Sequence, residues 1–279
     1  MNIFKKKILV VGKNSFIGKH FLIEPFEDAY ITKIGHEELS ATLMSQIHFD
    51  VVVNFSISPS AYSDNYSYND DTNIIIAKAL KNRDNCTLIM MSTRQVYGVE
   101  KDNSEESLAK PVSHYGANKL VVEDQVVKIL GLDRVAVLRC SNIYGFEINR
   151  KTFMGTMSSS LLKEDRIYLD FPAVTAKDFL PVKVFVQIVI DVIRARLTGL
   201  INVGSGVAVN CRKLADAFCQ GYGSGRVFHR DTKVEESFVL DISKIRALIE
   251  YPAINEAGIL ANIEDLGHEL RKYSNQFVS

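Results

Sequence analysis

Tryptophan is absent from this 279-residue chain, and cysteine and proline are scarce, with four and six residues. The four cysteines lie far apart and include no CxxC pair, so neither a disulfide scaffold nor a metal site is expected. Three of them lie in apolar or helix-like surroundings, where a thiol acts as a small buried hydrophobic group. The four are Cys86, Cys140, Cys211 and Cys219.

An excess of charge of one sign is also missing, because 33 basic residues balance 33 acidic ones. A surface that binds nucleic acid or an anionic membrane broadly needs such an excess, so neither partner is expected. Long apolar runs are missing as well. The run at 182–193 is interrupted by Lys183 and Asp191, and the apolar run near the N-terminus is too short for a signal peptide. We therefore expect a cytoplasmic protein.

What the chain does contain is 47% hydrophobic residues, enough for one large core or two lobes. Short β-branched runs alternate with longer helical patterns, which predicts βαβ units. The runs are almost wholly apolar, as expected where helices cover both faces of a sheet, so we predict an α/β doubly wound parallel sheet. The predicted strands are Ile8–Val11, Tyr30–Ile34, Val51–Asn54, Leu88–Met91 and Val135–Leu138, and the predicted helices are Phe16–Ile23, one capped by Asp70 or Asp71, and Tyr115–Leu130.

A glycine-containing turn follows the first predicted strand, in VVGKNSFIGKH (10–20). Gly12 permits a tight turn, Gly18 lets the helix pack closely on the sheet, and amides at the helix start can bind a pyrophosphate. Ser15 stands where a third glycine is usual, and it could cap the helix or donate its hydroxyl to a phosphate. The motif predicts a dinucleotide site, although a plain strand–helix turn can have the same spacing.

The second predicted strand lacks, at its end, the carboxylate with which NAD sites usually hold the ribose hydroxyls. The stretch ITKIGHEE (31–38) has Gly35 and His36 near that point, with Lys13 and Lys33 nearby. Without the carboxylate a 2′-phosphate is repelled less, and the basic groups attract it. These residues favour NADP(H) as the cofactor, with NAD(H) as the alternative.

A tyrosine precedes a lysine by four residues twice, at Tyr97–Lys101 and Tyr115–Lys119. The first pair lies in a polar stretch without helical period and is interpreted as a surface turn. The second opens a helical pattern, which puts both side chains on one face. A nearby ammonium stabilises a phenolate and lowers the tyrosine pKa from about 10 toward the neutral range. Tyr115 and Lys119 are therefore the predicted proton-transfer pair, and Thr93 or Ser92, at the end of the preceding predicted strand, could hydrogen-bond the same substrate oxygen.

Over nearly its whole length the chain resembles the extended short-chain dehydrogenase/reductases that act on nucleotide sugars. The resemblance implies a Rossmann fold and transfer of a hydride between a nicotinamide and a sugar carbon. Thr93, Tyr115 and Lys119 match the family's catalytic triad, with Tyr115 exchanging the proton. Seven segments carry the match in family order: GKNSFIG (12–18), DVVVNFS (50–56), MMSTRQVYG (90–98), SHYGANK (113–119), LRCSNIYG (138–145), KDFLPV (177–182) and INVGSG (201–206).

The same resemblance implies the binding residues. Lys177 stands where the family usually has arginine, so a bidentate contact with the substrate is not expected there. The expected cofactor-binding residues are Gly12, Lys13, Ser15, Phe16, Ile17, Gly18, His36, Asn54, Phe55, Ser56, Tyr115, Lys119, Cys140 and Ile143. The expected substrate-binding residues are Thr93, Arg94, Gln95, Asn142, Lys177 and Arg230. The loop at 56–69 adds three tyrosines, Tyr62, Tyr66 and Tyr68, that could stack on a sugar or base or simply face solvent.

The two residues after Thr93 separate the reactions of this family. Nucleotide-sugar 4,6-dehydratases carry Asp-Glu where this chain has Arg94-Gln95, and elimination of water needs an acid and a base there. Arginine stays protonated and glutamine does not titrate, which argues against a dehydratase.

Two enzyme functions and one other function remain. We favour an NAD(P)H-dependent 4-ketoreductase acting on a nucleotide-linked 4-keto(-6-deoxy) sugar, in deoxysugar or polysaccharide precursor biosynthesis. The short chain and the missing NAD-holding carboxylate support this choice. A 4-epimerase with tightly bound NAD is the alternative enzyme. A catalytically silent Rossmann protein that senses cofactor is the non-enzyme alternative.

The alternation of strands and helices weakens after about Gly145. We expect residues 1–145 and about 177–206 to form the dinucleotide-binding Rossmann domain. Residues of about 146–176 and 207–279 should form a smaller interleaved C-terminal substrate-binding lobe. The pattern over Tyr115–Leu130 places apolar residues on more than half of the helix circumference, wider than a one-sided helix needs. We therefore expect a homodimer that buries its second face, as in many relatives.

Overall fold

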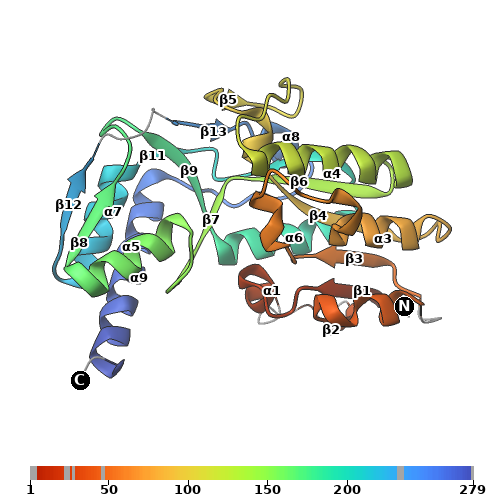
Figure 1. Ribbon diagram of the computed structural model, residues 1–279, viewed down its shortest axis with the longest axis horizontal. Coiled ribbons are helices and arrows are strands. Elements are labelled where there is room, and N and C mark those ends of the chain that lie inside the picture. Colours follow the sequence, from red (N-terminus) through yellow and green to blue (C-terminus); the bar gives the residue numbers. More distant parts are fainter. Residues whose placement is uncertain (1–4, 22–25, 27–28, 45–47, 231–235, 278–279) are drawn as a thin grey trace.

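A six-stranded sheet organises the larger part of the chain (Figure 1). The computed structural model describes residues 5–21, 26, 29–44, 48–230 and 236–277. The strands lie in the order β10-β6-β4-β3-β1-β2, and all neighbours are parallel. They are β1 (Lys6–Val11), β2 (Ala29–Ile34), β3 (Val51–Asn54), β4 (Thr87–Thr93), β6 (Val135–Cys140) and β10 (Gly199–Val203). All five predicted strands are confirmed, and the strand order reverses beside β1, where such sheets bind ligands.

Helices cover both faces of this sheet, which confirms the doubly wound α/β architecture. The strands bury apolar side chains on both faces, and β6 is buried at every position. On one face lie α1 (Phe16–Phe21) and α6 (Val182–Ala195). On the other lie α2 (Leu39–Met44), α3 (Thr72–Leu80) and α4 (His114–Leu130). Asp71 caps α3 as predicted, whereas the predicted end of the first helix at Ile23 lies outside the described residues.

A second group of elements packs around its own core, on the left of Figure 1. Its helices are α5 (Phe153–Glu164), α7 (Cys211–Tyr222) and α9 (Glu256–Phe277). Its sheets are β11 (Ala208–Asn210) with β9 (Ala176–Pro181) and β7 (Asn142–Tyr144), and β12 (Arg226–His229) with β8 (Arg166–Leu169). β9 thus joins this group rather than the main sheet. The division of the chain into two domains at the expected boundaries remains a prediction.

The chain returns to the larger core near its C-terminal end. β13 (Val239–Leu240) pairs with β5 (Asp102–Asn103), and α8 (Ser243–Arg246) follows. Leu240, Ile242 and Ile245 are buried against the main core, so this short segment connects the two parts of the molecule.

The segment after β4 is not the surface turn that the sequence suggested. It forms a 3₁₀ helix, η4 (Arg94–Tyr97), in which Tyr97 is fully buried. The Tyr97 hydroxyl donates to Asn202 Oδ1 at 2.7 Å, and the Arg139 guanidinium lies 4.9 Å from its ring centre. The prediction failed because an aromatic residue with a satisfied hydroxyl can be buried inside a polar stretch.

The four cysteines are buried and free, as the composition predicted. Within the described ranges, no helix is long and apolar enough to cross a membrane. The same ranges hold no group of three or more His, Cys, Asp or Glu side chains arranged to bind a metal ion.

Candidate active site

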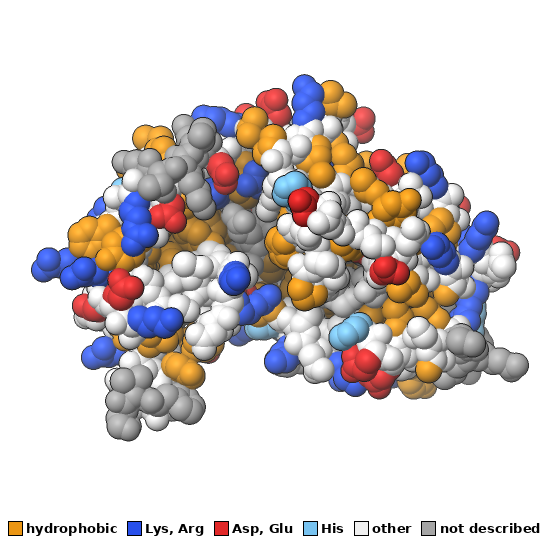
Figure 2. All heavy atoms as spheres, viewed as in Figure 1, with side chains coloured by type: hydrophobic (Ala, Val, Ile, Leu, Met, Phe, Trp, Pro, Cys, Tyr) orange, Lys and Arg blue, Asp and Glu red, His pale blue; other side chains and the backbone are white. Residues whose placement is uncertain are grey.

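The three predicted catalytic residues line one cavity of about 420 Å³ at the carboxyl ends of the strands. Thr93 ends β4, and Tyr115 and Lys119 lie on the first turns of α4. Figure 2 shows the surface hollowed between the two parts of the molecule, with Lys and Arg side chains along the border of the hollow. The cavity size falls within the usual range for small-ligand sites, about 300–1,000 Å³.

The start of α4 explains how Tyr115 and Lys119 are placed. The Ser113 hydroxyl accepts a hydrogen bond from the Gly116 amide at 3.1 Å, which caps the helix. A Cβ on Gly116 would lie 2.5 Å from the Gln95 carbonyl oxygen, so only glycine lets α4 pack this closely on η4. Lys119 Nζ donates to the Met91 carbonyl at 2.9 Å, which ties the ammonium to β4.

Thr93 is oriented by its own backbone turn. Its Oγ1 accepts a hydrogen bond from the Gln95 amide at 3.2 Å and so caps η4. Because this bond uses a lone pair of the hydroxyl, the hydroxyl hydrogen remains available to a substrate oxygen.

The electrostatics of the site differ from the prediction. Burial raises the pKa of Tyr115 above its ordinary value, with smaller contributions from Tyr62, Cys140 and Asp71. Burial also lowers the pKa of Lys119, against an opposing effect of Asp71. We had expected the ammonium to lower the tyrosine pKa. The prediction was wrong because burial, the largest effect on the pKa of Tyr115, disfavours the phenolate. Burial thus favours the neutral phenol of Tyr115.

The turn between β1 and α1 forms a close-packed cradle. Gly12 has a φ of +90°, and a Cβ there would lie 2.7 Å from the Ser56 amide. A Cβ on Gly18 would lie 2.2 Å from the Gly12 carbonyl oxygen. Ser15 Oγ accepts from the Gly18 amide at 3.0 Å, so the helix-capping role left open by the sequence is the one observed. This geometry fits a dinucleotide, because the first amides of α1 have no helical partner.

Most of the predicted binding residues meet at the catalytic cavity. These predicted residues include the rings of Phe16 and Phe55 and the side-chain amides of Gln95 and Asn142, and they come from segments far apart in the sequence. The predicted residues that line it, besides the catalytic three, are Ser15, Phe16, Ile17, Phe55, Ser56, Gln95, Cys140, Asn142 and Ile143.

Asn54 does not line the cavity but holds a residue that does. Its side chain is 1% exposed, and Nδ2 donates to Asn73 Oδ1 at 2.8 Å. Its Oδ1 accepts from both the amide and the hydroxyl of Ser56, at 3.0 and 2.6 Å. Asn54 therefore holds Ser56, which does line the cavity.

The end of β2 is less basic than the sequence suggested. Glu38, in the 3₁₀ helix η1 (His36–Glu38), accepts from Lys13 Nζ at 2.6 Å and from the Gly35 amide at 2.7 Å. His36 is exposed and lies 3.3 Å from the Glu37 carboxylate. β2 thus has no carboxylate at its last residue, but Glu37 and Glu38 follow a few residues later in η1. The Glu38 carboxylate neutralises the Lys13 ammonium. Spacing alone could not show that η1 folds back over the strand end.

Three predicted substrate residues lie outside the catalytic cavity. Arg94 stacks on the Phe238 ring at 4.0 Å and donates to the Gly98 carbonyl at 3.3 Å. Lys177 lines a neighbouring hollow of about 300 Å³ and pairs with Glu236 at 3.3 Å. Arg230 is half exposed and lies 3.8 Å from the ring centre of Tyr168.

The sequence did not identify Glu147 as a site residue. Its side chain lines the catalytic cavity and is 4% exposed. It accepts hydrogen bonds from the Thr152 hydroxyl and from Arg150 at 3.2 Å. Burial raises its pKa, against the effects of Thr152 and Arg150. No motif marks a single glutamate in a loop, so only the fold brings it into the cavity.

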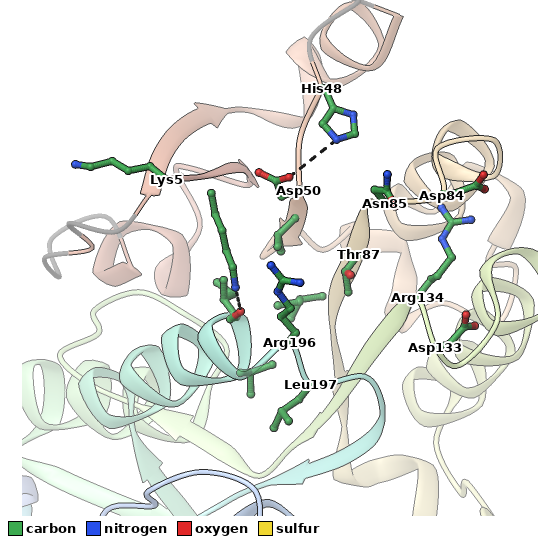
Figure 3. A pocket seen from close by; sticks show the side chains of 15 residues that line it. Lys5, His48, Asp50, Asp84, Asn85, Thr87, Asp133, Arg134, Arg196 and Leu197 are labelled. Carbon is green, nitrogen blue, oxygen red and sulfur yellow. Dashed lines mark hydrogen bonds and ion pairs between the residues drawn. The ribbon is translucent and has the colours of Figure 1, made fainter. Parts of the chain in front are cut away.

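A second cavity, of about 630 Å³, lies at the opposite edge of the sheet and contains none of the predicted site residues (Figure 3). Three of its charged groups hold main-chain groups of the fold in place. Arg134 donates to the Leu80 carbonyl at 2.6 Å near the end of α3. Lys6 donates to the Ile193 carbonyl at 2.6 Å near the end of α6. Asp50 accepts from the Lys7 amide at 2.7 Å. The predicted catalytic residues therefore all line the smaller cavity.

The fold and the smaller cavity together define a dinucleotide-dependent α/β enzyme. The NAD dependent epimerase/dehydratase family matches residues 8–164, which is more than half of the chain. The chain belongs to this family. No curated protein sequence matches it.

Solved structures share the fold over almost the whole chain. A dTDP-glucose 4,6-dehydratase from Bacillus anthracis str. Ames, in complex with NAD, is 18% identical over 96% of this chain and 99% of its own, with a TM-score of 0.76. RMD from Pseudomonas aeruginosa, complexed with NADPH, is 17% identical over 96% and 100%, with a TM-score of 0.77. A UDP-N-acetylglucosamine 4-epimerase from Methanobrevibacter ruminantium M1 is 19% identical over 98% of both chains, with a TM-score of 0.74.

Proposed function

We propose that this protein reduces a nucleotide-linked 4-keto sugar with a hydride from NAD(P)H. The observation that carries the proposal is that Thr93, Tyr115 and Lys119 line one cavity, so that a hydroxyl, a phenol and an ammonium can act on one ketone oxygen. Burial raises the pKa of Tyr115, which favours the phenol that donates a proton. A reductase needs such a donor at the start of each turnover, whereas an epimerase first needs a base that removes a proton.

The side chains of the cavity have complementary roles in this reaction. When bound, NAD(P)H supplies the hydride for the sugar carbon. Tyr115 donates its proton to the ketone oxygen, and the free hydroxyl hydrogen of Thr93 binds the same oxygen and orients it. Lys119 uses one donor on the Met91 carbonyl, which leaves two donors of its ammonium for a ribose or a water. As the bound ketone becomes an alkoxide, these donors stabilise the negative charge that develops.

The residues after Thr93 do not support dehydration. Gln95 Oε1 accepts from the Ser113 hydroxyl at 2.7 Å, which fixes its amide. Arg94 packs on Phe238, away from the catalytic cavity. Neither group can take up and release a proton, so an acid–base pair for removing water is missing at these two positions.

A 4-epimerase with bound NAD is the second candidate, and one observation favours it. Glu38 and Glu37 lie just after β2, near where NAD sites place a carboxylate for the ribose hydroxyls. The structurally similar proteins include both an epimerase and a protein complexed with NADPH. The identity of the cofactor is therefore part of the test.

The test begins with the cofactor in purified protein. We expect protein that lacks bound nucleotide, binds NADPH reversibly and oxidises it when dTDP-4-keto-6-deoxyglucose is added. Retained NAD together with interconversion of C4 epimers, without net oxidation of cofactor, would establish the epimerase instead. The Tyr115→Phe variant should reduce the ketone about a hundredfold to ten-thousandfold more slowly while still binding NADPH. If the wild-type protein binds cofactor but acts on no sugar, and Tyr115→Phe behaves like it, the cofactor-sensing alternative gains support.

A further inference from the structure

An outer hollow of about 520 Å³ adjoins the catalytic cavity. Tyr62, Gln95 and Tyr115 line both spaces, so the two meet at the catalytic tyrosine. A sugar whose reacting carbon lies at Tyr115 can therefore extend one of its substituents into the outer hollow. The other residues that line this hollow are Pro111, Val112, Ser113, His114 and Ala117.

The ring of Tyr62 gives the outer hollow an aromatic surface. It stacks on the ring of Tyr115, with centroids 4.5 Å apart and planes 11° apart. Because Tyr115 covers one face of the ring and Tyr62 is 61% exposed, the opposite face is available to a ligand. Asn118 Nδ2 donates to the carbonyls on both sides of Tyr62, at 3.0 Å to the Ala61 oxygen and 2.8 Å to the Ser63 oxygen. The backbone that carries the ring is therefore fixed to α4.

Gln95 gives the same hollow a hydrogen-bond donor. Its Oε1 accepts from the Ser113 hydroxyl at 2.7 Å, and the Ser113 oxygen accepts from the Gly116 amide at 3.1 Å. These bonds fix the orientation of the side-chain amide, whose NH₂ group makes no hydrogen bond to any described residue. Gln95 follows Thr93 by two residues, and its main-chain amide donates to Thr93 Oγ1 at 3.2 Å. The NH₂ group can therefore bind an acceptor on the sugar whose oxygen Thr93 holds.

The wall of the outer hollow is uncharged and partly apolar. Val112 is 72% exposed and lies next to Pro111. Covering such a side chain with an apolar group of a ligand is favourable. No Asp, Glu, Lys or Arg is among the described residues that line the hollow, so it does not suit a phosphate or another charged group. The hollow suits a neutral group with one hydrogen-bond acceptor and some apolar surface.

We propose that the outer hollow binds an acylamino substituent of the sugar, an inference that rests on the proposed function because it needs a nucleotide sugar at Tyr115. The Gln95 NH₂ group donates to the acyl oxygen. The planar amide stacks on the Tyr62 ring, and the alkyl end of the acyl group covers Val112. A hydroxyl in place of the acylamino group has neither a planar nor an apolar surface to offer. The protein should therefore distinguish acylated amino sugars from sugars with a hydroxyl at the same carbon.

The kinetic test compares keto sugars that differ in one substituent. One pair carries acetamido or hydroxyl at C2, and the other carries acetamido or hydroxyl at C3, on the same nucleotide and 4-keto-6-deoxy hexose. We expect kcat/KM to be about tenfold or more higher for the acetamido member of one pair, mainly through a lower KM, since a hydrogen bond and a small apolar contact are gained. Equal values within both pairs would overturn the proposal.

Variants of Tyr62 and Gln95 assign this preference to the outer hollow. Tyr62→Phe keeps the aromatic surface and should keep the preference, whereas Tyr62→Ala should lower it about threefold or more. Gln95→Leu removes the donor at similar size and should lower it in the same way. Because both residues adjoin Tyr115, the measured quantity is the ratio of kcat/KM within a pair, in which a general loss of activity cancels. A ratio that survives both Tyr62→Ala and Gln95→Leu would contradict the proposal.

Val112→Asp tests the apolar part of the wall at an exposed position. A carboxylate beside the acyl group should lower the ratio about threefold or more, because it stays hydrated and leaves the alkyl end uncovered. Val174→Asp is the matched control, since Val174 is 68% exposed and is not among the described residues that line the hollow. The control should keep the wild-type ratio. Equal ratios for the two variants would show that the acyl group does not reach Val112.

Binding without turnover separates failure of this subsite from failure of the proposed function. Calorimetry with NADPH bound uses the 4-hydroxyl counterparts of the same two pairs, which have no ketone to reduce. The acetamido member of one pair should bind about tenfold more tightly, and Gln95→Leu should abolish the difference. This selectivity in a protein that reduces no keto sugar would contradict the proposed function and leave the subsite established. Reduction of keto sugars without the selectivity would overturn the subsite alone.

Discussion

The Arg139 guanidinium lies 2.7 Å from the Glu123 carboxylate, and both side chains are almost completely buried between α4 and the main sheet. Glu123 follows Lys119 by one helical turn and also accepts a hydrogen bond from the Ser92 hydroxyl, next to Thr93. The pair therefore joins the helix that carries Tyr115 and Lys119 to the strand that ends at Thr93. We interpret it as the structural support of the catalytic residues.

Removing one partner of this ion pair should destabilise the folded protein. Arg139→Met leaves the Glu123 carboxylate buried without its counter-charge, so the free energy of unfolding should fall by about 3–5 kcal/mol. Urea unfolding followed by circular dichroism measures this. As a control, Arg212→Met breaks an exposed pair with Asp216 on α7 and should cost less than about 0.5 kcal/mol. Equal losses for the two variants would show that the buried pair has no special role.

Removing the tyrosine hydroxyl should lower stability at Tyr97 and catalytic activity at Tyr115. Tyr97→Phe leaves Asn202 Oδ1 without its buried donor and should lower the free energy of unfolding by about 1–3 kcal/mol. Its kcat should match that of the wild type below the unfolding transition. Tyr115→Phe should instead remain stable and lose activity. A large loss of kcat in folded Tyr97→Phe would contradict the assignment of Tyr97 to the core.

Glu38 should influence the choice between NADPH and NADH. In Glu38→Gln, Lys13 loses its ionic partner and can attract a 2′-phosphate, while the repulsion by the carboxylate disappears. The affinity for NADPH should rise relative to that for NADH by about three- to tenfold at low salt, because an exposed ion pair has only a modest electrostatic effect. Fluorescence titration with both cofactors measures the ratio. An unchanged ratio would place the 2′ position away from Glu38.

Glu147 should make the stability depend on pH. Burial raises its pKa above the ordinary value of 4.5, so the folded state binds this proton more tightly than the unfolded state. The resulting stabilisation is complete below about pH 4.5 and is lost as the pH rises through the folded-state pKa. Unfolding free energies of wild type and Glu147→Gln should therefore diverge above pH 4.5, with the wild type losing more. Parallel curves would show that Glu147 ionises normally.

The expected homodimer through α4 remains a prediction. Val121 on this helix is 40% exposed, whereas Val122 and Val126 are buried in the core of the protein. An exposed apolar side chain at a dimer interface tolerates no charge, so Val121→Asp should dissociate the dimer. Light scattering should show a dimer for the wild type at micromolar concentration and a monomer for the variant. A strictly monomeric wild type would rule out this interface.

The sequence was sufficient to predict features that depend only on neighbouring residues. Apolar runs predicted the five strands, and the cap of α3 was narrowed to Asp70 or Asp71, of which the structure has Asp71, because strand burial and capping depend on neighbouring residues. The choice of Tyr115–Lys119 over Tyr97–Lys101 also followed from helical spacing. The buried position of Tyr97 did not, because its partner Asn202 is more than a hundred residues away in the chain.

The sequence by itself determined the α/β class, the glycine turn after β1 and the Tyr–Lys spacing, since each depends on short-range geometry. Only the tertiary structure decided the electrostatics and the outer boundary of the site. It showed that burial raises the pKa of Tyr115, that Glu38 neutralises Lys13, and that Arg94 faces Phe238. It also placed Tyr62 on Tyr115. Desolvation and contacts between distant segments exist only once the chain is folded, so no local pattern could contain them.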